Sequence, residues 1–243
     1  MLDFLDLQNV LVFDIETAPG FKQFDELSDV FKAHWENKLG KKRADDENEA
    51  DFYFNNAGIY AEFGKIICIS AGYFRPVEGN TDNWQFTVTS FASHNEAHLL
   101  QQFADVLNKH YNNPARHYLC GHNIKEFDVP YVCRRMLIHG ITLPSIIDVA
   151  GKKPWEVKYI DTMELWKFGD YKNFTKLNLL TELFNIPTPK DDIDGSDVGR
   201  VYWHEDDLPR ITEYCQKDVL AVAQLVLRFK KIPLLTEANI SFT

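Results

Sequence analysis

VLVFDIET, residues 10–17, begins with a nearly continuous apolar run at 10–15 and carries two acidic residues, Asp14 and Glu16. Its length and its β-branched residues are typical of a strand buried at the centre of a sheet. Residues i and i+2 of a strand face the same side, so both carboxylates should project from one face. Two like charges repel each other and are costly to desolvate unless a cation lies between them. The stretch therefore predicts either a metal site or a pair of exposed acids at a strand end.

Two later segments carry acids in comparable settings. Asp128 lies in GHNIKEFDVPY, residues 121–131, where a predicted loop leads into a predicted helix and Pro130 suits its first turn. Asp128 could therefore be no more than the N-cap of that helix. Asp218 follows Tyr214 by four residues, so on a helix both side chains would point into one cleft. The alternative is that Tyr214 has no functional role and simply lies on an amphipathic helix. An acid such as Asp218 on a largely buried helix needs a partner, however, and a metal is one candidate.

The rest of the chain alternates strands and helices. Further strands are predicted at 65–74, 84–92, 117–123 and 157–162. Helices are predicted at 96–111, 129–140, 175–186 and 209–231. Turn residues at 76–83 indicate a hairpin, Ser93 and Glu96 have the spacing of a capping box, and Gly140 should end its helix. Residues 187–207 should form a long surface connection. This order predicts an α/β fold with a mixed central β-sheet flanked by helices.

Composition sets broad limits on the protein class. The 243 residues are enough for one large domain, and 45% apolar with 26% charged residues is typical of a globular protein. No run of eighteen apolar residues exists and the N-terminus lacks basic residues, which predicts no membrane span and no secretory signal. The spacing of Cys68, Cys120, Cys133 and Cys215 indicates reduced, mostly buried thiols in a cytoplasmic protein rather than a zinc site.

The net charge of −10 bears on the choice of partner. Tight binding of a duplex normally needs a basic face, so this charge argues against a high-affinity duplex binder. Divalent cations bound by a carboxylate cluster reverse the sign of the electrostatic potential around it. The charge therefore remains compatible with a nuclease that grips only the end of a strand.

In combination, the motifs resemble the DEDD superfamily of 3′→5′ exonucleases, in its tyrosine subclass, which has the ribonuclease H-like fold. Within that group the chain is most similar to the proofreading exonuclease domains of family B DNA polymerases. The residues that carry the resemblance are 13–17, 121–123, 127–131, 134–135 and 214–218, with a weaker match at 174–178. The resemblance covers roughly residues 8–230 and implies a single exonuclease domain over residues 1–243, standing apart from any polymerase domain.

The resemblance also implies roles for individual residues. The carboxylates expected to hold two Mg²⁺ or Mn²⁺ ions are Asp14, Glu16, Asp128 and Asp218. Asp14 would bridge both ions, Glu16 and Asp218 would complete the ion that holds the attacking water, and Asp128 would support the other. Tyr214 would orient that water, because a phenol with a pKa of about 10 is mostly protonated at neutral pH. The residues expected to bind substrate are Thr17, Asn123, Phe127 and Lys176.

The implied substrate is the 3′ end of single-stranded DNA, and a DNA polymerase or repair protein could act with this chain in trans. Nothing in the sequence separates deoxyribose from ribose, so an exoribonuclease or an oligonucleotide-degrading enzyme of the same fold is an alternative. A non-catalytic nucleic-acid binding module is another, although all four acids and Tyr214 are present. A structural or interaction protein whose acids are surface charge is a third.

Residues 22–57 interrupt the alternation with the charged run KKRADDENEAD and several aromatic residues. They predict an insertion that is either helical or a mobile flap. Because the insertion follows Thr17, it could cover the 3′ end and restrict the site to single strands, or it could simply pad the fold.

Overall fold

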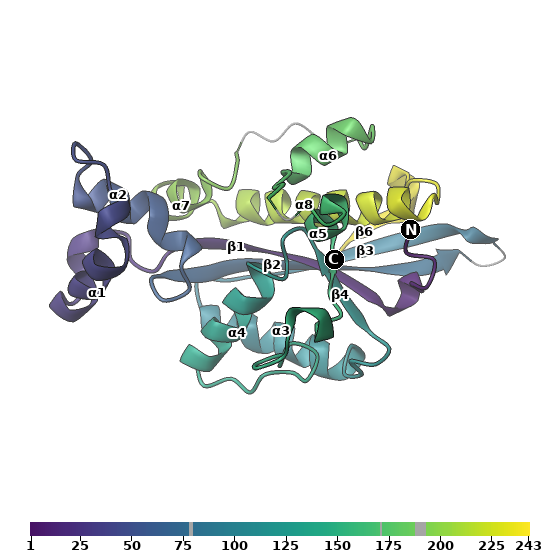
Figure 1. Ribbon diagram of the computed structural model, residues 1–243, viewed down its shortest axis with the longest axis horizontal. Coiled ribbons are helices and arrows are strands. Elements are labelled where there is room, and N and C mark those ends of the chain that lie inside the picture. Colours follow the sequence, from purple (N-terminus) through teal and green to yellow (C-terminus); the bar gives the residue numbers. More distant parts are fainter. Residues whose placement is uncertain (78–79, 171, 188–192) are drawn as a thin grey trace.

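The computed structural model describes residues 1–77, 80–170, 172–187 and 193–243 (Figure 1). Within these residues a six-stranded mixed sheet has the order β5-β4-β1-β2-β3-β6. The strands are β1 (Val10–Pro19), β2 (Gly64–Val77), β3 (Asn80–Ala92), β4 (Tyr118–Gly121), β5 (Ile160–Asp161) and β6 (Ile240–Phe242). The strands β1, β2 and β3 are antiparallel in succession, whereas β4 is parallel to β1, β5 to β4 and β6 to β3. The predicted α/β fold with a mixed sheet is confirmed.

Helices cover both faces of the sheet (Figure 1). The α-helices are α1 (Asp29–Leu39), α2 (Glu49–Asn56), α3 (Glu96–His110), α4 (Asp128–Ile138), α5 (Thr162–Lys167), α6 (Leu177–Leu183), α7 (Val198–Arg200) and α8 (Leu208–Lys230). Shorter turns are η1 (Leu7–Asn9), η2 (Phe24–Glu26), η3 (Gly40–Lys42), η4 (Ala57–Ile59), η5 (Pro154–Glu156), the π-helix η6 (Val201–Glu205) and η7 (Glu237–Asn239). None of the helices within the described ranges has the length and apolar character that a membrane span requires.

The strand β1 contributes to two hydrophobic cores because its apolar side chains alternate between the faces of the sheet. Leu11 and Phe13 pack with residues of α3 and α4, whereas Val10 and Val12 pack with residues of α8. Burial on both faces explains why the first half of β1 is a continuous apolar run. The acidic residues that follow keep the same alternation, and their positions are therefore set by the strand itself.

The start of α3 differs from the prediction. Its N-cap is Asn95, whose side chain accepts a hydrogen bond from His98 N at 3.2 Å, and Ser93 Oγ accepts one from Asn95 N instead. The predicted capping box between Ser93 and Glu96 is therefore wrong. Glu96 is buried and accepts hydrogen bonds from Ile66 N and from the Arg135 guanidinium, which compete for the carboxylate more strongly than an exposed backbone N–H.

The end of α4 agrees with the prediction. Gly140 has a φ of +69°, a left-handed conformation that a glycine adopts without strain. Gly140 N donates to Leu137 O at 3.1 Å, and Ile141 N donates to Met136 O at 2.8 Å. These two bonds satisfy carbonyl groups that the last helical turn leaves without partners.

Several element boundaries also differ. The strand predicted at 157–162 is limited to Ile160–Asp161, because the Asp161 side chain accepts hydrogen bonds from Met163 N and Glu164 N and so starts α5. The helix predicted at 175–186 is shorter and corresponds to α6. The strand β6 has no counterpart among the predictions. The predicted hairpin turn is shorter than expected, since β2 reaches Val77 and β3 begins at Asn80, with residues 78–79 outside the described ranges.

The predicted surface connection at 187–207 is only partly correct. Residues 188–192 lie outside the described ranges. The following residues form α7 and η6 rather than irregular loop, and Val198 and Val201 are buried in a cluster with Ala18 of β1 and Cys68 of β2. This segment therefore belongs to the core that lies beside the end of β1.

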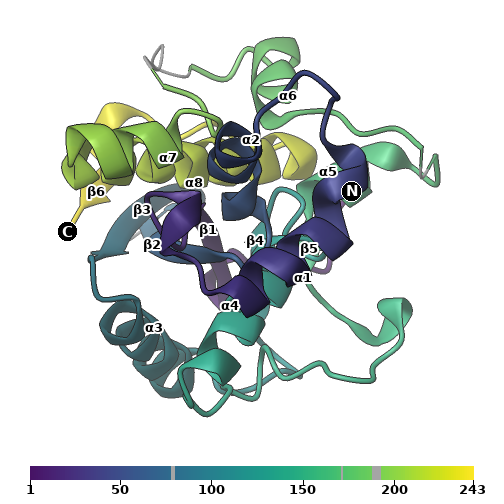
Figure 2. The same cartoon turned by 90° about the vertical axis from the view of Figure 1, so that its left-hand side faces the viewer.

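The predicted insertion is helical, with α1 and α2 lying beyond one end of the sheet, at the left of Figure 1 and toward the viewer in Figure 2. Its centre is Trp35, which is fully buried and contacts the rings of Phe52, Tyr53 and Phe63 at centroid distances of 5.6, 5.1 and 5.1 Å. An aromatic core of this kind explains why the charged run does not leave the segment unstructured. The helical alternative for the insertion is the correct one.

Candidate active site

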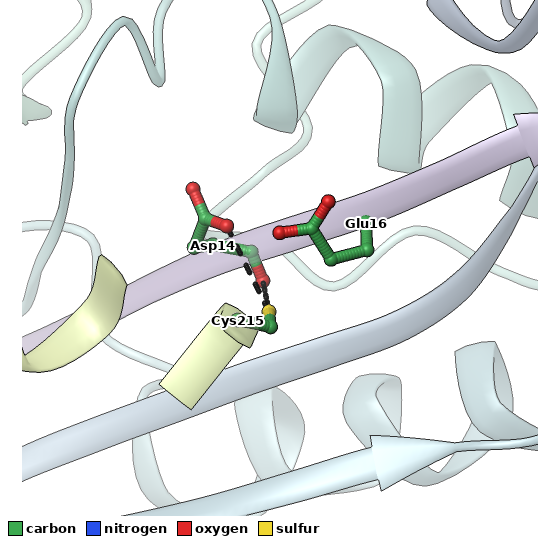
Figure 3. A group of neighbouring side chains, drawn as sticks. All are labelled: Asp14, Glu16 and Cys215. Atoms are coloured by element: carbon green, nitrogen blue, oxygen red, sulfur yellow. Dashed lines mark hydrogen bonds between the residues drawn. The ribbon is translucent and has the colours of Figure 1, made fainter. Parts of the chain in front are cut away.

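The two acids of β1 occupy the position that the strand pattern predicts. In the antiparallel register with β2, Asp14 lies opposite Ser70 and Glu16 lies opposite Cys68, and a bulge follows between Glu16 and Thr17. Oxygen atoms of both carboxylates and the Cys215 thiol lie within 4.8 Å of one another (Figure 3). The side chains of Asp14 and Glu16 therefore share one face of β1, directed toward α8.

The helix α8 supplies three more groups to this face. Cys215 Sγ lies 3.5 Å from Asp14 O and 3.7 Å from Asp14 Oδ2, which is within the range of weak thiol hydrogen bonds (Figure 3). Asp218 is near enough for its negative charge to raise the pKa of both Asp14 and Glu16. The Tyr214 hydroxyl, one turn earlier, is hydrogen-bonded to Asp218. The i, i+4 relation predicted for Tyr214 and Asp218 is thus realised on α8.

The fourth acid comes from α4. Asp128 is the first residue of this helix, and the N-cap is Phe127, which makes no side-chain capping bond. Instead, Asp128 Oδ1 accepts a hydrogen bond from Ile15 N at 3.3 Å, between the two acids of β1. The N-cap interpretation of Asp128 is therefore wrong. Contact with the β1 backbone directs this carboxylate into the sheet.

The electrostatics of the cluster favour a bound cation. Burial raises the pKa of Asp14 and of Glu16 well above the usual range, and the neighbouring carboxylates raise both further. Burial also raises the pKa of Asp128 to about 7, despite the hydrogen bond from Ile15 N. Among the described residues, no Lys or Arg forms an ion pair with Asp14, Glu16 or Asp128. Buried carboxylates of this kind require either protons or a metal ion.

The donor set fits hard divalent cations. The two β1 carboxylates lie within 4.8 Å of each other, and the carboxylates of Asp128 on α4 and Asp218 on α8 are near enough for their charges to raise the pKa of both. Oxygen ligands of this type are those that Mg²⁺ and Mn²⁺ prefer. The residues that could hold such ions are Asp14, Glu16, Asp128 and Asp218. A thiol is a poorer ligand for these ions, so Cys215 is better suited to contact Asp14 than to replace a carboxylate.

Tyr214 is suited to donate a hydrogen bond rather than to accept a proton. Burial raises the pKa of its phenol far above the ordinary value, and the charges of Asp218 and Glu16 add to this effect. The hydroxyl therefore keeps its proton at neutral pH. It can orient a water molecule or a phosphate oxygen beside the carboxylates.

Two of the residues expected to bind substrate lie next to the acids in the chain. Thr17 follows Glu16 at the bulge of β1 and shares a side-chain hydrogen bond with Tyr131. Phe127 precedes Asp128 and packs on the Tyr131 ring with centroids 5.5 Å apart.

Asn123, in the loop between β4 and α4, has a φ of +66° and donates a hydrogen bond from its backbone N to Asp161 Oδ1 at 3.0 Å. This backbone bond leaves the Asn123 side chain available for other contacts, and the residue lies partly exposed at the carboxyl end of β4.

Lys176, the fourth residue expected to bind substrate, is not brought to the acids by any described interaction. It is exposed at the N-cap of α6, and its charge lowers the pKa of Asp194 rather than that of a cluster carboxylate. In the described part of the chain it forms no ion pair with the four carboxylates.

The two thiols beneath the acids are a feature that sequence reasoning missed. Cys215 and Cys68 share a side-chain hydrogen bond, and Cys68 Sγ also lies 3.8 Å from Ser70 Oγ. All four cysteines carry free thiols and three of them are buried, as predicted. The only sequence signal for the pairing was the position of Cys215 between Tyr214 and Asp218, because the register that brings Cys68 opposite Glu16 is a pairing of strands about 50 positions apart.

Comparison with known proteins agrees with this geometry. Residues 59–238 match a family described as "Predicted 3'-5' exonuclease related to the exonuclease domain of PolB". This range contains Asp128, Tyr214 and Asp218 but begins after β1. No curated protein matches the chain.

A solved structure of the family B DNA polymerase from the hyperthermophilic archaeon Pyrobaculum calidifontis is similar, with a TM-score of 0.53 and 14% sequence identity. The similarity covers 90% of this chain and 24% of the polymerase chain, so the chain spans about a quarter of that protein. The shared architecture is the ribonuclease H-like fold. On the family match, the chain belongs to the predicted 3′→5′ exonucleases related to the exonuclease domain of PolB.

Proposed function

We propose that this protein is a metal-dependent 3′→5′ exonuclease that hydrolyses phosphodiester bonds at the 3′ end of single-stranded DNA. The observation that carries the proposal is the convergence of acids from three separate elements: Asp14 and Glu16 lie side by side, Asp128 accepts from Ile15 N between them, and the charge of Asp218 acts on both. The pKa values of Asp14, Glu16 and Asp128 are raised, and none of these three is paired with a cationic side chain among the described residues. Such a cluster is costly for a fold to maintain unless cations use it.

In this proposal each carboxylate has a defined task. Asp14 would help to hold both ions, Glu16 and Asp218 would help to hold the ion that activates the attacking water, and Asp128 would support the other. When bound, such ions supply a water of lowered pKa and stabilise the leaving 3′ oxygen. The hydrogen bond from Ile15 N holds Asp128 in orientation, so that this carboxylate need not reorganise during the reaction.

The remaining groups act on the substrate. The protonated Tyr214 hydroxyl orients the attacking water against the scissile phosphate. Thr17, Asn123 and Phe127 hold the terminal nucleotide beside the carboxylates. Lys176 contributes charge near the strand, at a greater distance from the acids. We further propose that residues 1–243 act as one exonuclease domain and that the insertion at 22–57 limits access to single strands.

The proposal is tested by incubating the protein with a 5′-labelled single-stranded DNA oligomer and Mg²⁺ or Mn²⁺, with and without chelator. We expect a ladder of products that shorten from the 3′ end, and no ladder when chelator is present. In Asp14→Asn the cleavage rate should be at least about 10²-fold lower, the loss typical of removing one transition-state stabiliser. Cleavage of an RNA oligomer of the same sequence, measured beside the DNA oligomer, decides whether the enzyme prefers DNA or RNA. Intact DNA and RNA under every condition would contradict the proposal and leave the two non-catalytic alternatives, a binding module and a structural protein.

A further inference from the structure

A groove of 680 Å³ lies along α4, the helix whose first residue is Asp128, and residues of α5 also line it. Most of its lining side chains are apolar, and none of the four acids is among the described residues that line it. Asn123, which we expect to hold the terminal nucleotide, does line it, and so do Val129 and Pro130, the two residues after Asp128. A strand held at Asn123 could therefore continue into this groove.

The groove is unusually rich in cations for a chain of net charge −10. Its cationic lining residues are Lys125, Arg134, Lys152 and Lys167. Of the three acids that also line it, Asp161 directs its carboxylate to backbone donors, accepting from Asn123 N and Lys125 N at 3.0 and 3.2 Å. Glu164 is paired with Lys125. Lys152 and Lys167 have no acidic partner among the described residues.

Exposed aromatic rings border the same groove. Trp155, next to the lining residue Pro154, is 76% exposed, and Lys153 Nζ lies 5.3 Å from its ring centroid. Phe174 is 63% exposed, and Nζ of Lys167 lies 4.0 Å from its ring centroid. A large aromatic ring in water forgoes burial that would stabilise the fold. Rings that alternate with lysines are the features with which proteins hold bases and phosphates of a single strand.

Phe168 adds a backbone observation to this pattern. It is 78% exposed and adopts a φ of +45° at the end of α5, a left-handed conformation that is unfavourable for an aromatic residue. Gly169 follows with a φ of +91° and would have accepted such a conformation without strain. The strained backbone therefore presents the Phe168 ring to solvent next to Lys167.

A pair of hydrogen bonds connects this aromatic border to the active site. The ring nitrogens of His122 lie 2.9 Å from Thr162 Oγ1 and 2.9 Å from Thr175 O. His122 immediately precedes Asn123, and Thr175 immediately follows Phe174. The segment that carries Phe174 is thus fixed beside the end of β4, within reach of a strand that is held at Asn123.

We propose that this groove, defined by Asn123, Lys152 and Lys167 with the bordering rings of Trp155, Phe168 and Phe174, binds the single strand on the 5′ side of the terminal nucleotide. The phosphates lie along the lysines and the bases stack on the rings. The inference rests on the proposed function, because it assigns the groove to the substrate of that same site. Double-stranded substrates are excluded from it, since paired bases cannot stack on side chains.

The test compares Trp155→Ala and Lys152→Glu with two matched controls, Phe4→Ala and Lys109→Glu. Phe4 is 69% exposed and contacts Tyr118 at the opposite end of β4, and Lys109 is exposed on α3. Each variant is first shown to melt at the wild-type temperature. Cleavage is then measured on a dinucleotide and on a single-stranded oligomer of about 16 nucleotides, the upper range of a single-strand footprint per domain.

For both groove variants we expect the KM of the longer oligomer to rise at least about fivefold. In Trp155→Ala the cause is the loss of one stacked base, and in Lys152→Glu it is the repulsion of a phosphate by the new carboxylate. The dinucleotide should be cleaved at the wild-type rate, and the controls should match wild type on both substrates. An unchanged KM for the longer oligomer, or an equal loss on both substrates, would overturn the assignment of the groove.

A second readout separates the groove from the proposed activity. Anisotropy of a fluorescent oligomer measures binding with chelator present, where no cleavage occurs. If wild type cleaves nothing but the groove variants bind at least about fivefold more weakly than the controls, the proposed function fails while the groove stands. Equal binding by all variants would refute the groove whether or not the wild type is active.

Discussion

At the scale of single residues, Asp128 shows why we expect the candidate site to need cations. Its carboxyl is buried and its pKa is raised to about 7, above the value near 3.9 of an unfolded chain. A raised folded pKa stabilises the protein below the unfolded pKa, and this stability is lost as the pH rises through the folded pKa. Without metal, the protein should therefore lose stability between about pH 4 and pH 8.

Asp128→Asn removes the titrating carboxyl but keeps the hydrogen bond from Ile15 N, because the amide oxygen of asparagine can still accept it. In chelator, we expect the variant to melt higher than wild type at pH 8, by about 2 kcal/mol or roughly 4–8 °C, with the gain shrinking toward pH 4. Thermal melts at several pH values measure the difference. A gap between variant and wild type that does not change with pH would contradict the buried charge.

Tyr214 provides a second test at this scale. Because its pKa is raised and it keeps its proton, it should position water rather than accept a proton. Tyr214→Phe should lower kcat by about 10²-fold, within the range for a positioned acid–base group, and leave KM nearly unchanged. Steady-state rates on single-stranded DNA from pH 6 to 9 check this. A wild-type rate that rises in proportion to phenolate would identify Tyr214 as a base instead.

At the scale of elements, one buried ion pair joins α3, α4 and β2. Glu96 accepts from Arg135 Nε at 2.8 Å, from Ile66 N at 2.7 Å, and lies 2.7 Å from His139 Nε2. Burial alone would raise the pKa of Glu96, but the hydrogen bonds from Arg135 and Ile66 N outweigh it and lower the pKa. Arg135 also donates to Ala61 O, so the pair connects the helices to the segment that follows the insertion.

Glu96→Gln should therefore be costly, since it leaves the Arg135 guanidinium buried without a counter-charge. We expect a loss of about 3–5 kcal/mol, seen in denaturant unfolding at neutral pH. Glu62→Gln is the matched control, because its ion pair with Lys38 is exposed and should be worth less than about 1 kcal/mol. Similar small losses in both variants would mean that the buried pair is not what holds these elements together.

Elements with long, regular sequence patterns are those that can be predicted from the sequence. The periodicity of α8 is long and regular, so the helix predicted at 209–231 lies within one residue of its observed bounds. The strand β1 begins at Val10 as predicted but extends four residues beyond the predicted end at Ile15. The capping box failed because Arg135, 39 positions away, takes the Glu96 carboxylate. The strand predicted at 157–162 ends one residue early because Asp161 caps α5, and its first three residues are not part of the strand. Local pattern does not reveal long-range partners of this kind.

At the scale of the whole molecule, the site is made by distant parts of the chain. Asp128 Oδ1 and Ile15 N are 113 positions apart, and Cys215 and Asp14 are 201 positions apart. The acids could be listed from the sequence because their local contexts, a strand end, a helix start and a helix face, were recognisable. The thiols beneath them, the groove beyond Asn123 and the packing of the insertion could not, since each depends on register and on tertiary contacts.

The central claim is that the acids of β1, α4 and α8 act as one cation site that supports cleavage at a 3′ end. The most direct measurement is a Mn²⁺ titration followed by electron paramagnetic resonance, with cleavage of a 5′-labelled oligomer recorded in the same samples. We predict that wild type binds two Mn²⁺ ions as activity appears, and that Asp14→Asn loses both binding and cleavage. Cleavage by Asp14→Asn at the wild-type rate, or activity in wild type without bound Mn²⁺, would contradict the claim.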